Sequence, residues 1–294
     1  MYCPRLDHFV RFNPNGTVSR CGHMVEPAQF DSLEQLDSSV WLRKIREKFN
    51  NNIWPNECQR CEEVEQESPS SIRIHALALD ELETQQDYLQ VGGVLDNVCN
   101  AACQTCSPEC STRIGALTGK TFPIVDNSNR FWELPQERIR HLDINGGEPS
   151  YSKNYKRLLA NLPPNLRTLR LNTNCNIVLT ELTEVAAKGI EVTVTVSCDG
   201  IGPVHEFMRW PIAWDIFYNN LMTYKTMPVR LNLWTTVSIL NVDDLPNIQA
   251  FAQTHNIDHG YSYLKQPLEL SIHNTDIAAR QAYIRKQKEL RGIQ

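Results

Sequence analysis

The sequence predicts an α/β protein in which a small cysteine-rich α+β module precedes a larger domain built on a parallel sheet. Two observations carry this prediction. Strand-like and helical segments alternate after about residue 85, and four cysteines with mixed α and β signals lie before it. Strands that alternate with helices imply right-handed crossovers and parallel strands. Five or six such units indicate a barrel, complete or partial, with its site at the carboxyl ends of the strands.

Length and charge narrow the class of protein. The chain has 294 residues, of which 41% are hydrophobic, so it can bury one large core and one smaller core. We assign residues 1–85 to the cysteine-rich module and residues 86–294 to the core domain. The formal net charge is -5, which gives none of the basic excess of a general nucleic-acid-binding protein.

The oxidation state of the cysteines depends on the cellular compartment that the sequence implies. The first residues show no signal-peptide pattern, and no apolar run approaches the ~20 residues of a membrane span. We therefore expect a cytoplasmic protein with no membrane partner. Thiols stay reduced there, so the ten cysteines of the chain are more often metal ligands than disulfides.

The module is expected to hold short elements. Residues 8–21 predict two short strands joined by an Asn-Pro-Asn-Gly turn. Apolar residues at helical spacing predict a helix over 33–49, capped by Asp31 or Ser32. A Cys-x-x-Cys turn at 58–61 then opens a charged helix.

The core domain is expected to alternate six strands with helices. Its strand segments share a richness in Leu, Val, Ile and Thr, and they lie at 88–97, 138–147, 166–174, 190–199, 229–239 and 259–265. Helical stretches are predicted near 151–162, 178–188, 211–226, 242–255 and 275–292.

Three cysteines follow the first of these strands at once. Cys99, Cys103 and Cys106 have the spacing C-x3-C-x2-C, so three thiolates on one loop can converge on one metal centre. Thiolates select zinc or an iron–sulfur cluster, and structural zinc usually takes four ligands. Three close cysteines favour a [4Fe–4S] cluster with one open iron. The alternative is that Cys110 closes a set of four.

This motif resembles that of the radical S-adenosylmethionine (SAM) superfamily, and "NGGEP" at 145–149 resembles the family's GGE motif. The resemblance implies a partial (β/α)6 TIM-like radical SAM barrel. It implies that three cysteines bind three irons of a catalytic [4Fe–4S] cluster, and that the fourth iron chelates SAM. Reductive cleavage of SAM would give a 5′-deoxyadenosyl radical, which abstracts hydrogen from a substrate. The protein supplies orientation and shielding.

The resemblance also assigns residues to SAM. Gly146 and Gly147 permit close backbone approach, and Glu148 offers a carboxylate to the SAM ammonium group. Ser197 and Asp199 match the family's ribose segment, and Arg209 matches an arginine that contacts the SAM carboxylate. For each, the alternative is a structural role: a glycine turn with a surface glutamate at 146–148, and fold-stabilising contacts at the other three.

The sequence departs from the family pattern at three positions. Thr105 stands where an aromatic or large residue usually precedes the third cysteine, which puts adenine packing on that loop in doubt. Cys175 replaces a familiar glycine, and Cys198 lies within the ribose-like segment. Buried cysteine commonly acts as a small hydrophobe, so we expect both to be packing residues.

Four cysteines remain in the module: Cys3, Cys21, Cys58 and Cys61. Their arrangement resembles the auxiliary-cluster modules called SPASM and twitch domains, although those usually follow the barrel. The resemblance implies a second, auxiliary [4Fe–4S] cluster. A four-cysteine zinc knuckle that staples the N-terminal segment is the alternative, because both metals accept four thiolates.

Together these features predict a cytoplasmic radical SAM enzyme, an oxidoreductase or other substrate-modifying iron–sulfur enzyme. Its expected partners are a peptide, protein or small-molecule substrate and a reductase, flavodoxin or ferredoxin that donates electrons. The competing hypothesis is a non-enzymatic iron–sulfur or zinc protein that carries electrons or binds a partner. An electron carrier needs neither an open iron nor a SAM pocket, so "NGGEP" argues against it.

Overall fold

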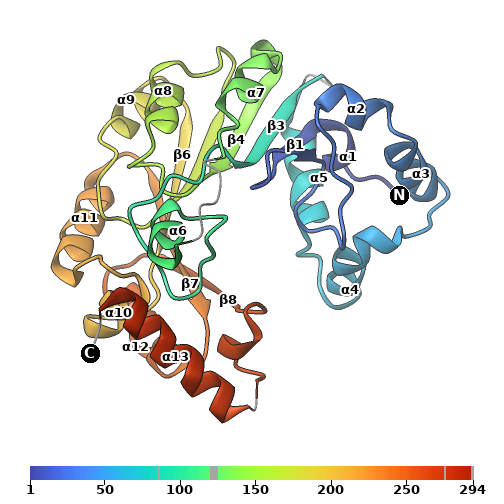
Figure 1. The fold of residues 1–294 in the computed structure, drawn as a ribbon. Helices are drawn as coiled ribbons and strands as arrows, with labels where there is room; N and C mark the ends of the chain where they lie inside the picture. The colour runs from blue at the N-terminus through green and yellow to red at the C-terminus, as the bar shows by residue number, and fades with distance from the viewer. Residues whose placement is uncertain (85–86, 120–124, 275, 293–294) are drawn as a thin grey trace. The chain divides into compact units, whose positions relative to one another are not determined.

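The computed structural model describes residues 1–84, 87–119, 125–274 and 276–292. These residues form a mixed α/β fold with an eight-stranded sheet, in the order β2-β1-β3-β4-β5-β6-β7-β8 (Figure 1). The chain divides into two compact units. The first unit comprises Met1–Leu95, Val125–Ile144 and Leu162–Arg167, and the second comprises Asp96–Ile124, Asn145–Asn161 and Thr168–Gln294. The predicted boundary at residue 85 stays a prediction.

The first unit combines short helices with four strands. The strands are β1 (Phe9–Phe12), β2 (Val18–Ser19), β3 (Leu89–Val94) and β4 (Ile139–Asn145), the last residue of which belongs to the second unit. The helices are α1 (Arg5–His8), α2 (Leu33–Ser38), α3 (Val40–Asn50), η1 (Asn56–Cys58), α4 (Gln59–Glu67), α5 (Ile72–Leu82), α7 (Ser128–Glu133) and η2 (Gln136–Arg138).

The predicted N-terminal hairpin is confirmed, and it also joins the sheet. Strand β2 pairs antiparallel with β1, while β1 pairs parallel with β3 in the register Val10 to Val91. In the same unit, α3 buries Leu42, Ile45 and Phe49. These side chains pack in one cluster with Leu6, Met24 and the buried cysteines of the module.

The helix predicted over residues 33–49 is two helices. Ser32 caps α2 by accepting from the backbone N–H of Gln35, so the serine of the two predicted caps is the one used. The chain becomes extended at Ser39, whose side chain caps α3 by accepting from Leu42. A serine offers the same hydroxyl cap at either site, and apolar spacing alone does not reveal such a break.

The second unit continues the alternation of strands and helices. Its strands are β5 (Thr168–Thr173), β6 (Glu191–Ser197), β7 (Arg230–Val237) and β8 (Asp258–Tyr263). Its helices are α6 (Thr112–Thr118), α8 (Lys153–Ala160), α9 (Leu182–Ala187), α10 (Pro203–Met208), α11 (Trp214–Thr226), η3 (Val242–Asp244), α12 (Leu245–Thr254), η4 (Leu268–Leu270) and α13 (Ile277–Arg291). Strands β3 to β7 fall within the predicted segments, and β8 begins one residue before its segment, at Asp258.

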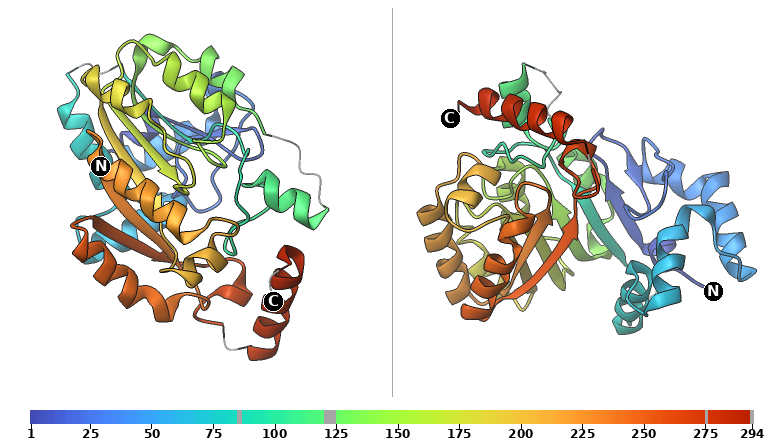
Figure 2. Two further views of the ribbon diagram at one scale, coloured as in Figure 1. Left: turned by 90° about the vertical axis from the view of Figure 1, so that its left-hand side faces the viewer. Right: turned by 90° about the horizontal axis from the view of Figure 1, so that it is seen from below.

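Parallel pairing and side-chain alternation explain why the site lies at one edge of this unit. Strands β5, β6, β7 and β8 pair in parallel, so their carboxyl ends share an edge. Leu169, Leu171, Val194 and Leu233 are fully buried or nearly so, whereas the intervening positions are polar. Helix α9 contacts β6 and α12 contacts β8, and Figure 2 shows these helices along one side of the strands. The polar positions therefore belong to the opposite face.

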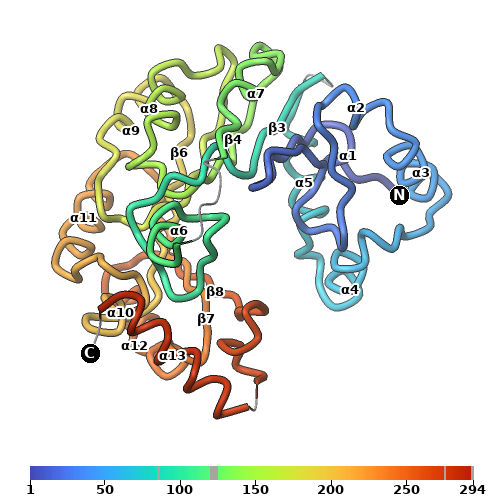
Figure 3. The backbone as a smooth tube through the Cα atoms, viewed as in Figure 1, coloured from blue at the N-terminus to red at the C-terminus, as the bar shows by residue number. Residues whose placement is uncertain are grey.

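The chain ends on α13, which follows β8 and η4 (Figure 3). Helix α13 contacts η4 and also α6, which follows the cysteine loop in the sequence. Among the described residues, no helix has both the length and the apolar character needed to cross a membrane. Partial barrel closure and the twitch-like nature of the N-terminal segment stay predictions.

Candidate functional site

A pocket with an empty volume of about 610 Å³ opens at the strand ends of the second unit. Asn145 ends β4, Thr173 ends β5 and Ser197 ends β6, and all three line it. The other walls come from the cysteine loop, the Gly-Gly-Glu turn and Arg209. Cys99, Cys103 and Cys106 line the pocket together with five of the six residues predicted to bind SAM: Gly146, Gly147, Glu148, Ser197 and Arg209.

The cysteine loop is fixed through its backbone. The N–H of Ala102 donates to the carbonyl of Trp210 at 2.7 Å, and the N–H of Gln104 donates to the carbonyl of Met208 at 2.9 Å. Cys103 between them is buried, with 7% of its surface exposed. The end of α10 and the residues just after it therefore fix the backbone of the loop, and the same segment carries Arg209.

The glycine turn packs directly on the start of this loop. The N–H of Gly147 donates to the carbonyl of Asp96 at 2.8 Å, and that of Glu148 donates to the carbonyl of Val98 at 2.9 Å. A Cβ atom on Gly147 would lie 2.4 Å from the Val98 carbonyl oxygen. Only glycine permits this approach, which brings the turn and the cysteine loop to one pocket.

Glu148 is a buried carboxylate with ordered partners. Its Oε1 accepts from the Ser150 hydroxyl at 2.6 Å and from the Thr173 hydroxyl at 2.7 Å, and its Oε2 accepts from the N–H of Asn174 at 2.7 Å. Burial raises the pKa of Glu148, while these hydrogen bonds act in the opposite direction. A carboxylate held in this way is oriented for a cation in the pocket.

Arg209 and Asp199 form a buried ion pair. Arg209 donates from Nη1 to Asp199 Oδ2 at 2.9 Å, and the second Asp199 oxygen accepts from the N–H of Thr236 at 2.8 Å. Burial alone would lower the pKa of Arg209, but the charges of Cys103 and Asp199 raise it above its ordinary value. Asp199 is not among the described residues that line the pocket. It contacts Arg209, which does line the pocket, and its predicted contact with ribose stays a prediction.

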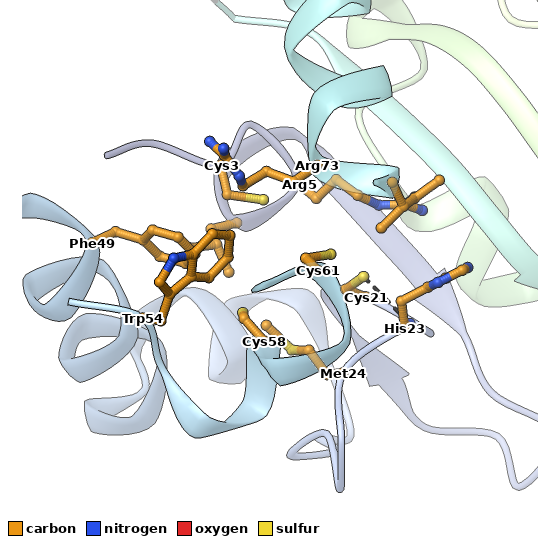
Figure 4. A pocket seen from close by; sticks show the side chains of 12 residues that line it. Cys3, Arg5, Cys21, His23, Met24, Phe49, Trp54, Cys58, Cys61 and Arg73 are labelled. Atoms are coloured by element: carbon orange, nitrogen blue, oxygen red, sulfur yellow. Dashed lines mark hydrogen bonds between the residues drawn. The ribbon is translucent and has the colours of Figure 1, made fainter. Parts of the chain in front are cut away.

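Another pocket lies in the first unit, with an empty volume of about 350 Å³. We call it the first pocket, and we call the pocket at the strand ends of the second unit the second pocket. Cys3, Cys21, Cys58 and Cys61 all line it, although they come from three separate parts of the sequence (Figure 4). Cys3 precedes α1, Cys21 follows β2, Cys58 ends η1 and Cys61 lies in α4. Most of the remaining wall is apolar, with Met24, Phe49, Trp54 and Ile72 as contributors.

The first pocket also contains a buried cation. Arg5 is 8% exposed, and within the described chain its Nε has no hydrogen-bond partner. Its guanidinium lies 3.7 Å from the ring centroid of Phe9. A buried charge without its full set of partners is costly, so Arg5 favours an anionic occupant of this pocket.

Burial raises the pKa of thiols in both pockets. Burial raises the pKa of Cys99 to about 12, with the charge of Cys103 as a second cause. Burial likewise raises the pKa of Cys3 to about 12. Since thiolates are the ligands, metal binding must displace these protons. Within the described part of the chain, no group of three or more His, Cys, Asp or Glu side chains is arranged to hold a single metal ion.

Four further residues of the second pocket were not predicted to bind SAM: Asn145, Asn172, Thr173 and Asn174. Asn145 opens the "NGGEP" motif, and the other three lie at the end of the next strand. Cys175 and Cys198 are fully buried, as expected of packing residues. Their thiols donate to backbone carbonyls, those of Phe217 and Gly200 respectively. Cys175 also has a φ of 61°, a left-handed conformation that glycine adopts more readily than other residues.

Comparisons with known proteins give structural similarity alone. No protein-family model matches the sequence, and no curated protein sequence does. A structure of anSMEcpe with bound AdoMet is similar at 12% identity and a TM-score of 0.47, over 64% of this chain and 55% of that one. Streptococcus suis SuiB bound to S-adenosylmethionine is similar at 13% identity and a TM-score of 0.49, over 95% of this chain and 67% of that one. SuiB bound to its precursor peptide SuiA gives 12% identity and a TM-score of 0.48, over 98% of this chain and 70% of that one. The chain thus spans little more than half the length of anSMEcpe.

Proposed function

We propose that the chain is a radical SAM enzyme that binds a [4Fe–4S] cluster and S-adenosylmethionine in the pocket of the second unit. One observation carries the proposal: the C-x3-C-x2-C loop, the Gly-Gly-Glu turn and Arg209 line a single pocket at the strand ends. These segments are far apart in the sequence, and each carries a motif that by itself points to the same cofactors. Their convergence favours one shared ligand over unrelated structural roles.

The residues of this pocket fit both groups. Cys99, Cys103 and Cys106 would hold three irons, which leaves one iron for SAM. When bound, the cluster would supply the electron that splits SAM into methionine and a 5′-deoxyadenosyl radical, which abstracts hydrogen from the substrate. Arg209, whose Nε lacks a partner among the described residues, can meet a carboxylate.

The chain's own residues would orient SAM. Glu148 would meet the ammonium group, and the backbone of Gly146 and Gly147 would permit close approach. Ser197 and Asp199 would hydrogen-bond the ribose hydroxyls. The buried position of the cysteine loop would exclude water from the reacting centre.

For the first unit we propose an auxiliary [4Fe–4S] cluster bound by Cys3, Cys21, Cys58 and Cys61. Four thiolates around one pocket satisfy the ligand count, and Arg5 would offset part of the negative charge of such a cluster. Zinc remains the alternative occupant, because it also accepts four thiolates. Under the proposal the N-terminal segment is a twitch-like module and the core is a partial barrel.

The wider context is part of the same proposal. The substrate would be a peptide, a protein or a small molecule, and a reductase, flavodoxin or ferredoxin would donate the electron. We place the enzyme in the cytoplasm. The competing hypothesis is a non-enzymatic metal protein, and it requires no cleavage of SAM.

The test is anaerobic reconstitution followed by reduction in the presence of SAM. The wild-type chain is expected to form 5′-deoxyadenosine, and Cys103→Ala is expected to form none because it removes one of three ligands. Cys175→Ala is the matched control, since it removes a buried thiol outside the set. A wild-type chain that binds iron but neither binds nor cleaves SAM would support the electron carrier and reject the enzyme.

A further inference from the structure

Helix α13 is hydrogen-bonded to the cysteine loop through the side chain of Arg291. Arg291, the final residue of α13, is buried with 7% of its surface exposed. Its Nε donates to the carbonyl of Ala102 at 2.9 Å, and its Nη2 donates to the carbonyl of Cys103 at 3.3 Å. One guanidinium therefore bridges two consecutive carbonyls at the centre of the three-cysteine motif.

These bonds complete the pairing of the loop. The N–H groups of Ala102 and Gln104 donate to carbonyls of residues 208–210, at the end of α10 and just after it, while the carbonyls of Ala102 and Cys103 accept from Arg291. The loop is thus held from two elements that lie about 80 residues apart in sequence, at 208–210 and at 291. Removal of one element leaves the polar groups on that side without partners, and buried polar groups without partners are unfavourable.

Arg291 is itself held in position. Its Nη1 donates to the carbonyl of Gln287 at 3.1 Å and to the side-chain oxygen of Gln287 at 2.5 Å, one turn earlier in α13. The three nitrogens of the guanidinium are therefore all engaged, two of them on the cysteine loop. A lysine would keep the charge but could not bridge both carbonyls in the same plane.

We infer that Arg291 is a positioning residue that fixes the geometry of the Cys103 loop, and that α13 is a structural part of the catalytic centre. The inference rests on the proposed function for its role in catalysis, but its geometric content concerns the loop alone. A cation this close to the loop would also stabilise a negatively charged centre bound there. Arg291 has no place in the motif that predicts the site, so the sequence gives no sign of this role.

The experiment measures the opening of the loop directly. Full-length protein without metal is treated with iodoacetamide under native, reducing conditions, and alkylation at Cys103 is followed by peptide mass spectrometry. Arg291→Gln and Arg291→Lys are both expected to speed alkylation of Cys103 about tenfold or more, because two charge-assisted bonds that close the loop are lost. Arg285→Gln changes an exposed arginine of the same helix and is expected to react as wild type.

A second readout separates charge from geometry in the reconstituted protein. The reduction midpoint of the second-unit cluster, followed by electron paramagnetic resonance, is expected to fall in Arg291→Gln and to stay closer to wild type in Arg291→Lys. Amide exchange in β6 and β7 checks that both variants remain folded.

The results that overturn the inference are distinct from those that overturn the enzyme. Unchanged Cys103 alkylation in both Arg291 variants would show that the two hydrogen bonds of Arg291 do not hold the loop. Equal acceleration in Arg285→Gln would assign the effect to α13 as a whole and reject the specific role of Arg291. A wild-type chain without SAM cleavage, in which Arg291→Gln still speeds alkylation, would reject the proposed function and keep the positioning role.

Discussion

The two cysteine pockets gather sulfur in opposite ways. In the first unit, four cysteines come from three separate parts of the sequence, at residue 3, residue 21 and residues 58–61, and meet among Met24, Phe49 and Trp54. In the second unit, three cysteines lie within eight residues of one loop and meet the polar ends of strands. The first pocket has an empty volume of about 350 Å³ and the second has about 610 Å³.

The number of thiols and the other lining groups determine which kind of metal centre each pocket can bind. Four thiolates can satisfy every metal position of a centre, and the described lining of the first pocket adds apolar side chains and cations such as Arg5, but no carboxylate for the ammonium group of a further ligand. Three thiolates leave one position open, and the second pocket adds the Glu148 carboxylate and the Arg209 guanidinium beside it. We therefore expect a closed centre in the first unit and a reactive centre in the second.

The largest expected effect comes from emptying the first pocket alone. Cys58→Ala combined with Cys61→Ala removes two of four thiolates, which leaves too few to hold a centre. Iron should fall from about eight to about four per chain, and turnover of the true substrate should stop. Cleavage of SAM without substrate should persist, since its residues lie in the other pocket. Iron analysis and 5′-deoxyadenosine assays on the same sample measure both.

Three results would break this division. Tight zinc in the wild-type first pocket, with about four irons elsewhere, would replace the auxiliary cluster by a zinc staple. Product formation at the wild-type rate would reduce the N-terminal cysteines to a structural role. Loss of both activities with an intact second cluster would show that the first unit is needed for SAM binding.

A smaller effect is expected at Glu148. Glu148→Gln keeps the size of the side chain but removes its charge, so the SAM affinity should fall about tenfold or more while the cluster stays. Isothermal titration with SAM and the visible spectrum of the cluster measure the two properties. Glu109→Gln, at an exposed position in another segment of the second unit, is the matched control. An unchanged affinity would mean that the glutamate of the turn is structural.

Local patterns were enough for most elements and for part of the site. The alternation of strands and helices after residue 85 predicted β3 to β8 because apolar runs and turn residues are local signals. The cysteine loop and the Gly-Gly-Glu turn were visible for the same reason, as short motifs whose residue types restrict the chemistry. Their meeting in one pocket follows from parallel strands, which place successive carboxyl ends side by side.

The rest depends on contacts between distant segments. Asp199 was assigned to ribose from its motif, yet its buried contact with Arg209 is a property of the folded chain. The break at Ser39 is set by a competition between capping and helix continuation, which spacing does not reveal. Arg291 contacts the cysteine loop across about 190 residues of sequence, so no window on the sequence contains both partners.

Acid stability should depend on a histidine of the second unit. Burial, and then the charge of Arg209, lower the pKa of His205 to about 3, against 6.5 ordinarily. As pH falls below 6.5, this histidine is protonated in the unfolded chain but stays neutral in the folded chain. The free energy of unfolding therefore decreases by up to about 1.4 kcal/mol per pH unit, down to about pH 3. His205→Leu should flatten this acid dependence.

Urea unfolding at pH 7 and pH 5 measures the effect of His205. The matched control, His75→Leu, removes an exposed histidine of the first unit and should leave the pH dependence as in wild type. An equal acid dependence in wild type and His205→Leu would mean that other groups govern acid unfolding. Amide exchange at β6 and at β1 then shows in which unit the acid sensitivity lies.

The smallest expected effect decides whether the comparison of the two pockets holds at all. Cys110 lines the second pocket beside Cys106, and its thiol interacts with that of Cys106. If Cys110 is a ligand, both pockets are four-thiolate centres and neither has an open position for SAM. We expect Cys110→Ala to keep its iron, its visible spectrum and its cleavage of SAM, because the three spaced cysteines suffice to hold three irons. Cys106→Ala should lose all three properties. Loss of the cluster in Cys110→Ala would remove the open iron on which the enzyme depends, and the electron carrier would then be the better account of the second unit.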